Sequence, residues 1–118
     1  MARKPLVVLV SQDLRTRSFI RAQLKEEGIE VAAFRRLEDA RQWLYIGGHV
    51  PDLFLIDIWR TSLSNEFVKW LGDISDRSPV MFLTGARETL SQELEDMGEP
   101  LRRPISIREI VTRIRSRL

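Results

Sequence analysis

Residues 52–57 read Asp-Leu-Phe-Leu-Ile-Asp, and this segment decides the fold because four consecutive apolar residues lead directly into a carboxylate. A short, continuous apolar run is typical of a strand that is buried on both faces of a parallel sheet. In open parallel sheets, functional sites lie outside the carboxyl ends of the strands. We therefore expect Asp57 at the carboxyl edge of a central strand, with any functional site around it.

Apolar segments on both sides of this strand alternate with helical patterns. Further strands are expected at residues 6–10, 29–34 and 79–84 and near Leu101. Between and after these strands, five helical patterns carry apolar residues at three- and four-residue spacing. In chain order, the five predicted helices carry Phe19, Ile20 and Leu24; Leu37, Ala40 and Leu44; Phe67, Trp70, Leu71 and Ile74; Leu90 and Leu94; and Ile107, Ile110, Val111, Ile114 and Leu118. This alternation predicts an α/β, doubly wound (βα)5 flavodoxin-like sandwich whose five-stranded parallel sheet has the order 2-1-3-4-5.

Helix boundaries are marked by capping residues. Asp13 can cap the first helix, and Gly28 and Gly47-Gly48 are expected to end the first and second helices. Ser106 with Glu109 three residues later forms the pattern of a capping box, which predicts the start of the last helix.

Length and composition fit one domain over residues 1–118. The chain has no cysteine, so disulfides and thiolate metal sites are excluded. Its net charge is +2, from 19 basic and 17 acidic residues, and this near-balance argues against a dedicated nucleic-acid binder. No apolar run is long enough to cross a membrane or to form a signal peptide, so the expected location is the cytoplasm.

The C-terminal segment is basic. From residue 102 onward it carries six arginines against the single acid Glu109. Either these arginines form a solvated helix face, which is the interpretation we favour, or they form a basic face for an acidic partner. A DNA-binding role for the last helix is a minor alternative.

Polar residues follow four of the expected strands and should meet at one rim of the sheet. They are Ser11-Gln12-Asp13 after the first strand, Asp57 after the third, Thr84 after the fourth and Arg103 after the fifth. This convergence is the candidate functional site.

With these residues in place, the chain resembles a response-regulator receiver domain of bacterial two-component signalling over essentially its whole length. The resemblance rests on residues 6–28, 51–57, 79–84, Arg103-Pro104 and the last helix. It implies that Asp57 accepts a phosphoryl group from a histidine kinase and that Thr84 hydrogen-bonds this group. It also implies a phosphate-pairing lysine at the position of Arg103, and two acidic magnesium ligands at the positions of Ser11 and Gln12.

The sequence departs from the family pattern at this site. Ser11 and Gln12 are neutral, and arginine replaces the lysine at position 103. Thr61, Asn65 and Pro100 stand where the family usually has proline, glycine and a switching aromatic residue. The stretch from Thr84 to Arg103 is also about two or three residues shorter than usual in the family.

These departures weaken the expected magnesium site, because Mg²⁺ prefers oxygen ligands that include one or two carboxylates. Ser11 and Gln12 offer only neutral oxygens. Asp13 could reach the rim, but capping the first helix is its expected role, so no confident metal or other cofactor is assigned. Arg103 can grip an anion with two hydrogen bonds. It either forms an ion pair with Asp57 that locks the site without phosphate, or points to solvent.

Two other residues near the ends of strands were considered for the site. Trp59 either covers Asp57 or, as we favour, packs on the third helix. His49, the only histidine, lies in a Gly-Gly-His-Val-Pro turn and is expected to be an exposed loop residue.

The sequence thus favours a divergent receiver domain that acts as a regulatory and protein-interaction module, not an enzyme, with weak or no Mg²⁺-dependent phosphorylation at Asp57. A conventional phosphoacceptor is the alternative. A flavin- or nucleotide-binding domain is a remote one, because residues 11–15 lack the glycines of a phosphate-binding loop. Expected partners are a histidine kinase or an output domain, and the resemblance points to the face made by the fourth helix, fifth strand and fifth helix as a possible homodimer contact.

Overall fold

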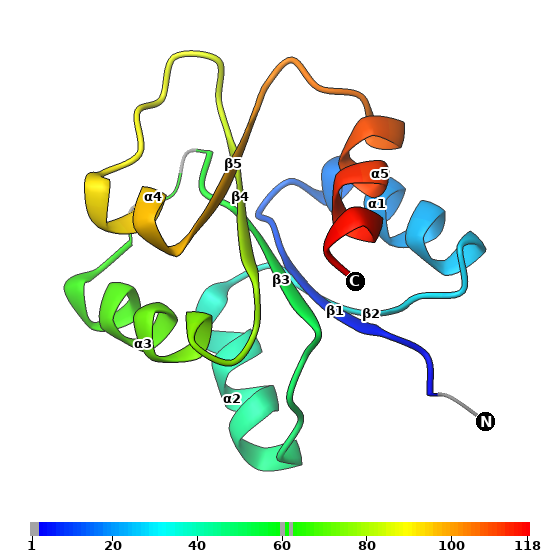
Figure 1. Cartoon of the computed structure of the whole chain (residues 1–118), viewed down its shortest axis with the longest axis horizontal. Helices are drawn as coiled ribbons and strands as arrows, with labels where there is room; N and C mark the ends of the chain where they lie inside the picture. The colour runs from blue at the N-terminus through cyan, green and yellow to red at the C-terminus, as the bar shows by residue number, and fades with distance from the viewer. Residues whose placement is uncertain (1–2, 60, 62) are drawn as a thin grey trace.

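The computed structural model describes residues 3–59, 61 and 63–118. The strands within them are β1 (Leu6–Val10), β2 (Glu30–Phe34), β3 (Leu53–Asp57), β4 (Val80–Thr84) and β5 (Gly98–Arg102). The helices are α1 (Leu14–Glu26), α2 (Leu37–Gly47), α3 (Asn65–Ser75), α4 (Gln92–Met97) and α5 (Ile107–Arg117). The strands form a parallel sheet in the order β2-β1-β3-β4-β5, which confirms the predicted doubly wound fold (Figure 1).

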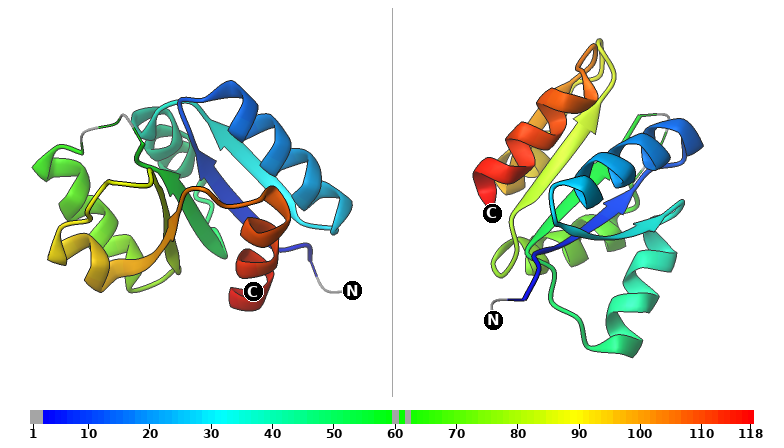
Figure 2. Two further views of the ribbon diagram at one scale, coloured as in Figure 1. Left: turned by 90° about the horizontal axis from the view of Figure 1, so that it is seen from above. Right: turned by 90° about the vertical axis from the view of Figure 1, so that its right-hand side faces the viewer.

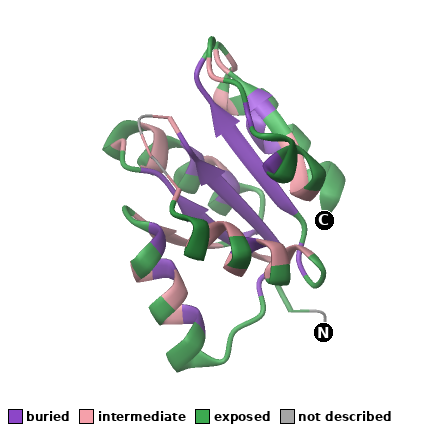
Figure 3. Cartoon of the chain, turned by 90° about the vertical axis from the view of Figure 1, so that its left-hand side faces the viewer, coloured by how far each residue is buried: buried purple, intermediate pink, exposed green. Residues whose placement is uncertain are grey.

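Helices cover both faces of the sheet (Figure 2). On one face, α1 and α5 pack against alternate strand residues in a cluster that includes Leu9, Leu55 and Leu83. On the other face, α2, α3 and α4 pack against Val8, Phe54 and the residues that share their side of the sheet. Because β1, β3 and β4 are buried on both faces (Figure 3), their sequences are continuously apolar rather than alternating.

Strand register brings the carboxyl ends of the strands to one rim. Asp57 pairs with Leu83, and Thr84 pairs with Arg102, so β3 ends one residue short of the level at which β4 and β5 end together. Figure 1 shows the loops after these strands together at the upper end of the sheet. The site expected from sequence therefore has the backbone framework that it needs.

Most helix boundaries follow the predicted caps. Asp13 accepts a hydrogen bond from the backbone N–H of Arg15 at the start of α1, and Ser106 accepts one from Glu109 at the start of α5. Gly48 ends α2 in the left-handed conformation, with φ of 62°, which a side chain would disfavour.

Three details of the sequence interpretation are corrected. Phe19 was expected on the buried side of α1, but it is 59% exposed, because Ile20 and Leu24 occupy the face that meets the sheet and Phe19 is turned about 100° from Ile20. Leu118 was expected in the apolar stripe of α5, but it lies beyond the helix and is exposed. Leu90 is buried as expected, yet it precedes α4, which begins only at Gln92.

The amino-terminal end of β3 is tied to the first residues of the chain. The carboxylate of Asp52 accepts two hydrogen bonds from the Arg3 guanidinium, at 2.9 and 3.0 Å, and one from the backbone N–H of Leu6 at 2.7 Å. The hydrogen bonds from Arg3 are the main cause of a lowered pKa for Asp52. The charged carboxylate therefore stabilises the folded chain.

This contact predicts a specific acid sensitivity. The pKa of Asp52 is lower in the folded than in the unfolded chain. The charged carboxylate therefore adds to the free energy of unfolding at pH values above its ordinary pKa of about 4, and this stabilisation is lost as the pH falls from there through the lowered pKa of the folded chain. Asp52→Asn should make the free energy of unfolding less dependent on pH in this range, as measured by urea unfolding at successive pH values. Asp73→Asn, at an exposed position on α3 without an ion pair among the described residues, should keep the wild-type dependence. If the free energy of unfolding changed equally with pH in the wild type and in Asp52→Asn, Asp52 would not be the source of the acid sensitivity.

Candidate functional site

The carboxylate of Asp57 is the centre of the site and has every acceptor position filled. Its Oδ1 accepts hydrogen bonds from Arg103 Nη1 at 3.0 Å and from the backbone N–H of Trp59 at 3.1 Å. Its Oδ2 accepts from Arg103 Nη2 at 2.7 Å and from Ser11 Oγ at 2.8 Å. A carboxylate has about four lone-pair sites. Asp57, which is only 4% exposed, is thus held by four donors and has little contact with water.

Arg103 provides the positive charge that makes this burial possible. Its guanidinium binds Asp57 through two parallel hydrogen bonds, the strongest arrangement available to this pair of groups. The residue is fixed at the end of β5 because its backbone N–H donates to the carbonyl of Thr84 at 3.0 Å, and Nη1 reaches the same carbonyl at 3.3 Å. Of the two alternatives left open by the sequence, the ion pair is therefore present, and the one in which Arg103 points to solvent is wrong.

The three residues after β1 differ in burial and in the contacts that they make. Ser11 is fully buried, and its backbone N–H donates to the carbonyl of Phe34, which aims the hydroxyl at Asp57. Gln12 is exposed. Asp13 caps α1 and also accepts a 2.6 Å hydrogen bond from the Thr16 hydroxyl, which is the main cause of its lowered pKa.

Trp59 lies against the guanidinium of Arg103, with 5.1 Å between the guanidinium carbon and the ring centroid. The ring also lies beside Gly85, where an added Cβ would come within 2.8 Å of Trp59 Cδ1. Trp59 therefore covers the charged pair through a cation–π contact. This is the interpretation that the sequence analysis did not favour, and it depends on the absence of a side chain at position 85.

Thr84 lies beside the pair but does not bond to it through its side chain. Its Oγ1 is buried and has no hydrogen-bond partner within the described residues. A buried hydroxyl without a partner carries a free-energy cost of about 1–3 kcal/mol. Among the buried side chains that the structure describes at this site, Thr84 is thus left with unused bonding capacity.

The other residues singled out from sequence lie outside this cluster. Thr61 donates its backbone N–H to Ile58, Asn65 begins α3, and Pro100 lies exposed in the middle of β5. His49 is exposed as expected and stacks on Trp43, with ring centroids 4.3 Å apart.

The residues around Asp57 do not fit a magnesium site. Within the described residues, Asp57 is the one carboxylate that contacts Arg103, and its oxygens already accept four hydrogen bonds, which leaves none free for a cation. Asp13 is engaged in capping, and Gln12 faces solvent. Across residues 3–59, 61 and 63–118, no three acidic, histidine or cysteine side chains gather as metal ligands would.

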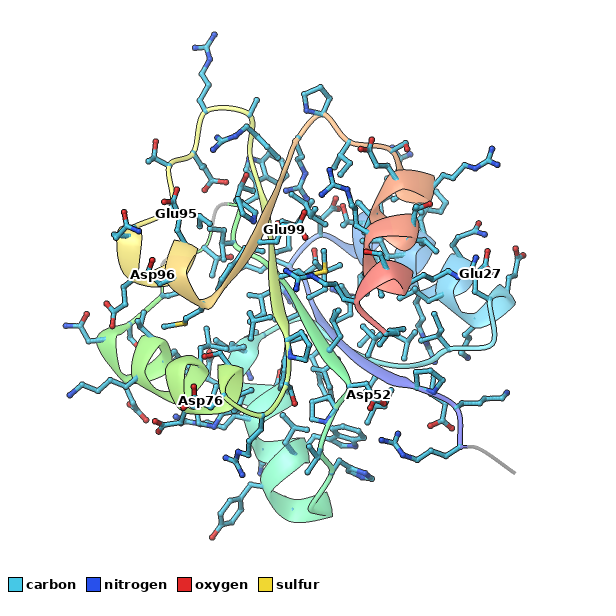
Figure 4. All side chains as sticks on the ribbon, in the orientation of Figure 1. Glu27, Asp52, Asp76, Glu95, Asp96 and Glu99 are labelled. Atoms are coloured by element: carbon cyan, nitrogen blue, oxygen red, sulfur yellow. The ribbon has the colours of Figure 1, made fainter. Side chains whose placement is uncertain are left out.

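The basic residues near the C-terminus are largely paired within the chain. Arg113 and Arg117 form ion pairs with Glu99 on β5, and Arg115 forms one with Glu27 after α1; Figure 4 labels both acids. These pairs could not be found from the acids of residues 102–118 alone. Glu99, just before this segment, and Glu27, far from it in the sequence, reduce the net positive charge of this face.

Comparison with solved structures identifies the fold. The receiver domain of the Francisella response regulator 1452 matches with a TM-score of 0.77 and 23% identity over 97% of this chain and 96% of that chain. The chemotaxis response regulator CheY4 of Vibrio cholerae matches with 0.76 and 19% over 98% and 99%. HP1043, an orphan response regulator of H. pylori, matches with 0.76 and 18% over 100% and 99%.

The chain therefore has the CheY-like fold of response-regulator receiver domains. No protein-family model matches the sequence. The curated proteins likewise contain no match. Among the described residues, no helix combines the length and the apolar character that crossing a bilayer requires.

Proposed function

We propose that this chain is a divergent receiver domain that works as a regulatory and protein-interaction module in two-component signalling, without phosphorylation at Asp57. A single observation carries the proposal: all four acceptor positions of the Asp57 carboxylate are occupied, two of them by Arg103. An oxygen of Asp57 must lose at least one of these donors before it can attack phosphorus.

Charge supports the same conclusion. Phosphoryl transfer depends on positioning and on neutralising the charge of the transferring oxygens, usually with a metal ion. Here the only cation bound to Asp57 within the described residues is the Arg103 side chain, and two of its five N–H groups donate to the carboxylate itself. Arg103 therefore stabilises the unmodified aspartate rather than an incoming phosphate.

This arrangement predicts that Mg²⁺ has no specific effect on the wild-type protein. Addition of Mg²⁺ should leave the melting temperature unchanged, since a ligand stabilises a protein only by binding to its folded state. A variant with Ser11→Asp, Gln12→Asp and Arg103→Lys restores carboxylates and frees Asp57, so Mg²⁺ should raise its melting temperature. Ca²⁺ at the same concentration controls for ionic strength. A saturable Mg²⁺-dependent rise in the wild type would contradict the proposal.

A second candidate is a conventional phosphoacceptor, and the Thr84 side chain favours it. Its buried Oγ1 lacks a partner among the described residues, and a phosphoryl oxygen on Asp57 could supply one. Arg103 would then have to move from the carboxylate to the phosphoryl group. The intact mass of the protein after treatment with acetyl phosphate and Mg²⁺ separates the two candidates.

The partners that we propose are a histidine kinase or an output protein. Contact through α4, β5 and α5, including a homodimer, would be constitutive, because the exposed Pro100 in β5 cannot act as a switching aromatic residue. The role is regulatory rather than enzymatic, and the proposed location is the cytoplasm.

A further inference from the structure

A cleft of about 750 Å³ lies between α2 and α3, on the face of the sheet that these helices cover. Its floor is formed by Phe54 and by Trp70, whose rings meet edge to face at 6.0 Å. Tyr45 and Ile74 line its sides from the last turns of α2 and α3. The volume falls within the range of about 300–1,000 Å³ that small-molecule sites occupy, and the walls are mainly apolar and aromatic.

The third wall is a loop that several contacts hold in place. Gly48 turns the chain sharply at the end of α2, and His49 then stacks on Trp43. The hydroxyl of Ser78 donates to the carbonyl of Pro51 at 2.6 Å, which joins the loop before β3 to the loop before β4. The cleft is therefore formed before a ligand arrives, which lowers the entropic cost of binding.

Charge is distributed unevenly along the cleft. Arg41 and Glu66 pair at 2.8 Å and bridge the two helices. Glu38 lines the cleft from the first turn of α2, whereas Arg77 lines it just beyond the end of α3. Because both helices return from the same edge of a parallel sheet, these two residues lie at opposite ends. Arg77 makes no ion pair within the described residues, so its charge is available to a ligand.

We propose that this cleft binds a flat, amphipathic aromatic anion, with its rings against the floor formed by Phe54 and Trp70 and its single carboxylate at Arg77. Aromatic walls favour a ring system that can stack or meet them edge to face. The planar guanidinium favours a carboxylate that can accept two hydrogen bonds. Glu38 repels an anion from the other end and so sets the orientation. The inference does not depend on the chemistry of Asp57.

The test uses 2-naphthoate as the probe and its neutral analogue 2-naphthamide, followed by NMR of ¹⁵N-labelled protein. Naphthoate should cause saturable shifts of the Trp70 indole N–H and of amides along the cleft, with a dissociation constant on the order of 0.1–1 mM. The Trp59 indole at the Asp57 site should not move. Naphthamide should bind about tenfold more weakly, because it lacks the charge that Arg77 recognises.

Matched variants test the two parts of the site separately: the cation that would bind the carboxylate and the aromatic wall that would contact the rings. Arg77→Gln should weaken naphthoate about tenfold and leave naphthamide unchanged, whereas Lys69→Gln, an exposed cation on α3 outside the cleft, should change neither. Tyr45→Ala should weaken both probes, and Ile46→Ala, the exposed neighbour on α2 that does not line the cleft, should weaken neither. Tyr45 is 89% exposed, so its removal leaves the core intact.

Three results would overturn the proposal. They are the absence of saturable shifts in the cleft at several times the expected dissociation constant, equal affinities for the two probes, and equal effects of Arg77→Gln and Lys69→Gln. Shifts in the cleft that grow with protein concentration, without any probe, would assign it to a second copy of this chain and would also overturn the proposal.

Discussion

Replacing Arg103 by alanine should lower the free energy of unfolding by about 2–4 kcal/mol, because it leaves the buried Asp57 carboxylate without its counter-charge. The Asp57 side chain is 2% exposed and that of Arg103 is 22% exposed, so the two partners are not equivalent. If Asp57 is replaced by alanine, Arg103 can turn to solvent, and the loss should be smaller, about 1–2 kcal/mol. Urea unfolding with an unchanged slope measures both values.

A double-mutant cycle isolates the pair. In the Asp57→Ala background, Arg103→Ala should cost less than about 1 kcal/mol, because no buried charge is left behind. Arg102→Ala is the matched control: this neighbouring arginine is exposed and donates to the backbone carbonyl of Glu88, so its loss should cost no more than about 1 kcal/mol. Additive effects of the Asp57 and Arg103 substitutions would show that the two residues are not coupled.

Gly98→Ala should destabilise the protein by about 3 kcal/mol or more. An added Cβ at Gly98 would lie 1.9 Å from the carbonyl oxygen of Val80 and 2.7 Å from its carbonyl carbon. Both atoms belong to the backbone of the adjacent strand, so β4 and β5 would have to separate. The same substitution at Gly72, inside α3, meets only Met97 Cε at 3.5 Å.

Gly72→Ala is therefore a control with the opposite sign. Alanine favours a helix interior over glycine by about 0.5–1 kcal/mol, so this variant should be more stable than wild type. Thermal and urea unfolding of the two variants give the comparison directly. A loss of less than about 1 kcal/mol for Gly98→Ala would show that the strands yield easily at this position.

The close approach at Gly98 gives a physical reason for the shortened stretch between Thr84 and Arg103. Helix α4 ends at Met97 and β5 begins at the next residue, with no connecting loop. The chain can turn there because a residue without a side chain passes close to β4. The shortening can be read from the sequence, but the contact cannot, because it depends on the spacing of two strands.

The sequence could predict which residues meet at the site, because these residues stand directly after the predicted strands. Asp57, Thr84 and Arg103 each follow an apolar run, and a parallel sheet brings such positions to one rim. The sequence suggested an ion pair between Arg103 and Asp57, but it could not decide between this pair and an Arg103 that points to solvent. A long side chain at the end of a strand can extend in several directions. The position of Trp59 was interpreted wrongly, because it depends on the space over Gly85, a residue 26 positions away.

The cleft between α2 and α3 could not be predicted from the sequence. Periodicity identified Leu44 and Ile74 on the inner faces of their helices, but it gives no distance between two helices that share one face of a sheet. Only the packed structure shows that Tyr45 and Trp70, on two different helices, line the same cleft.

We propose that Arg103 holds Asp57 in a state that does not accept phosphate, and the intact mass of the protein after treatment with acetyl phosphate and Mg²⁺ tests this. We expect no added phosphate on the wild type, and one phosphate on the variant with Ser11→Asp, Gln12→Asp and Arg103→Lys. A stoichiometric gain of one phosphate by the wild type, absent from Asp57→Asn, would contradict it.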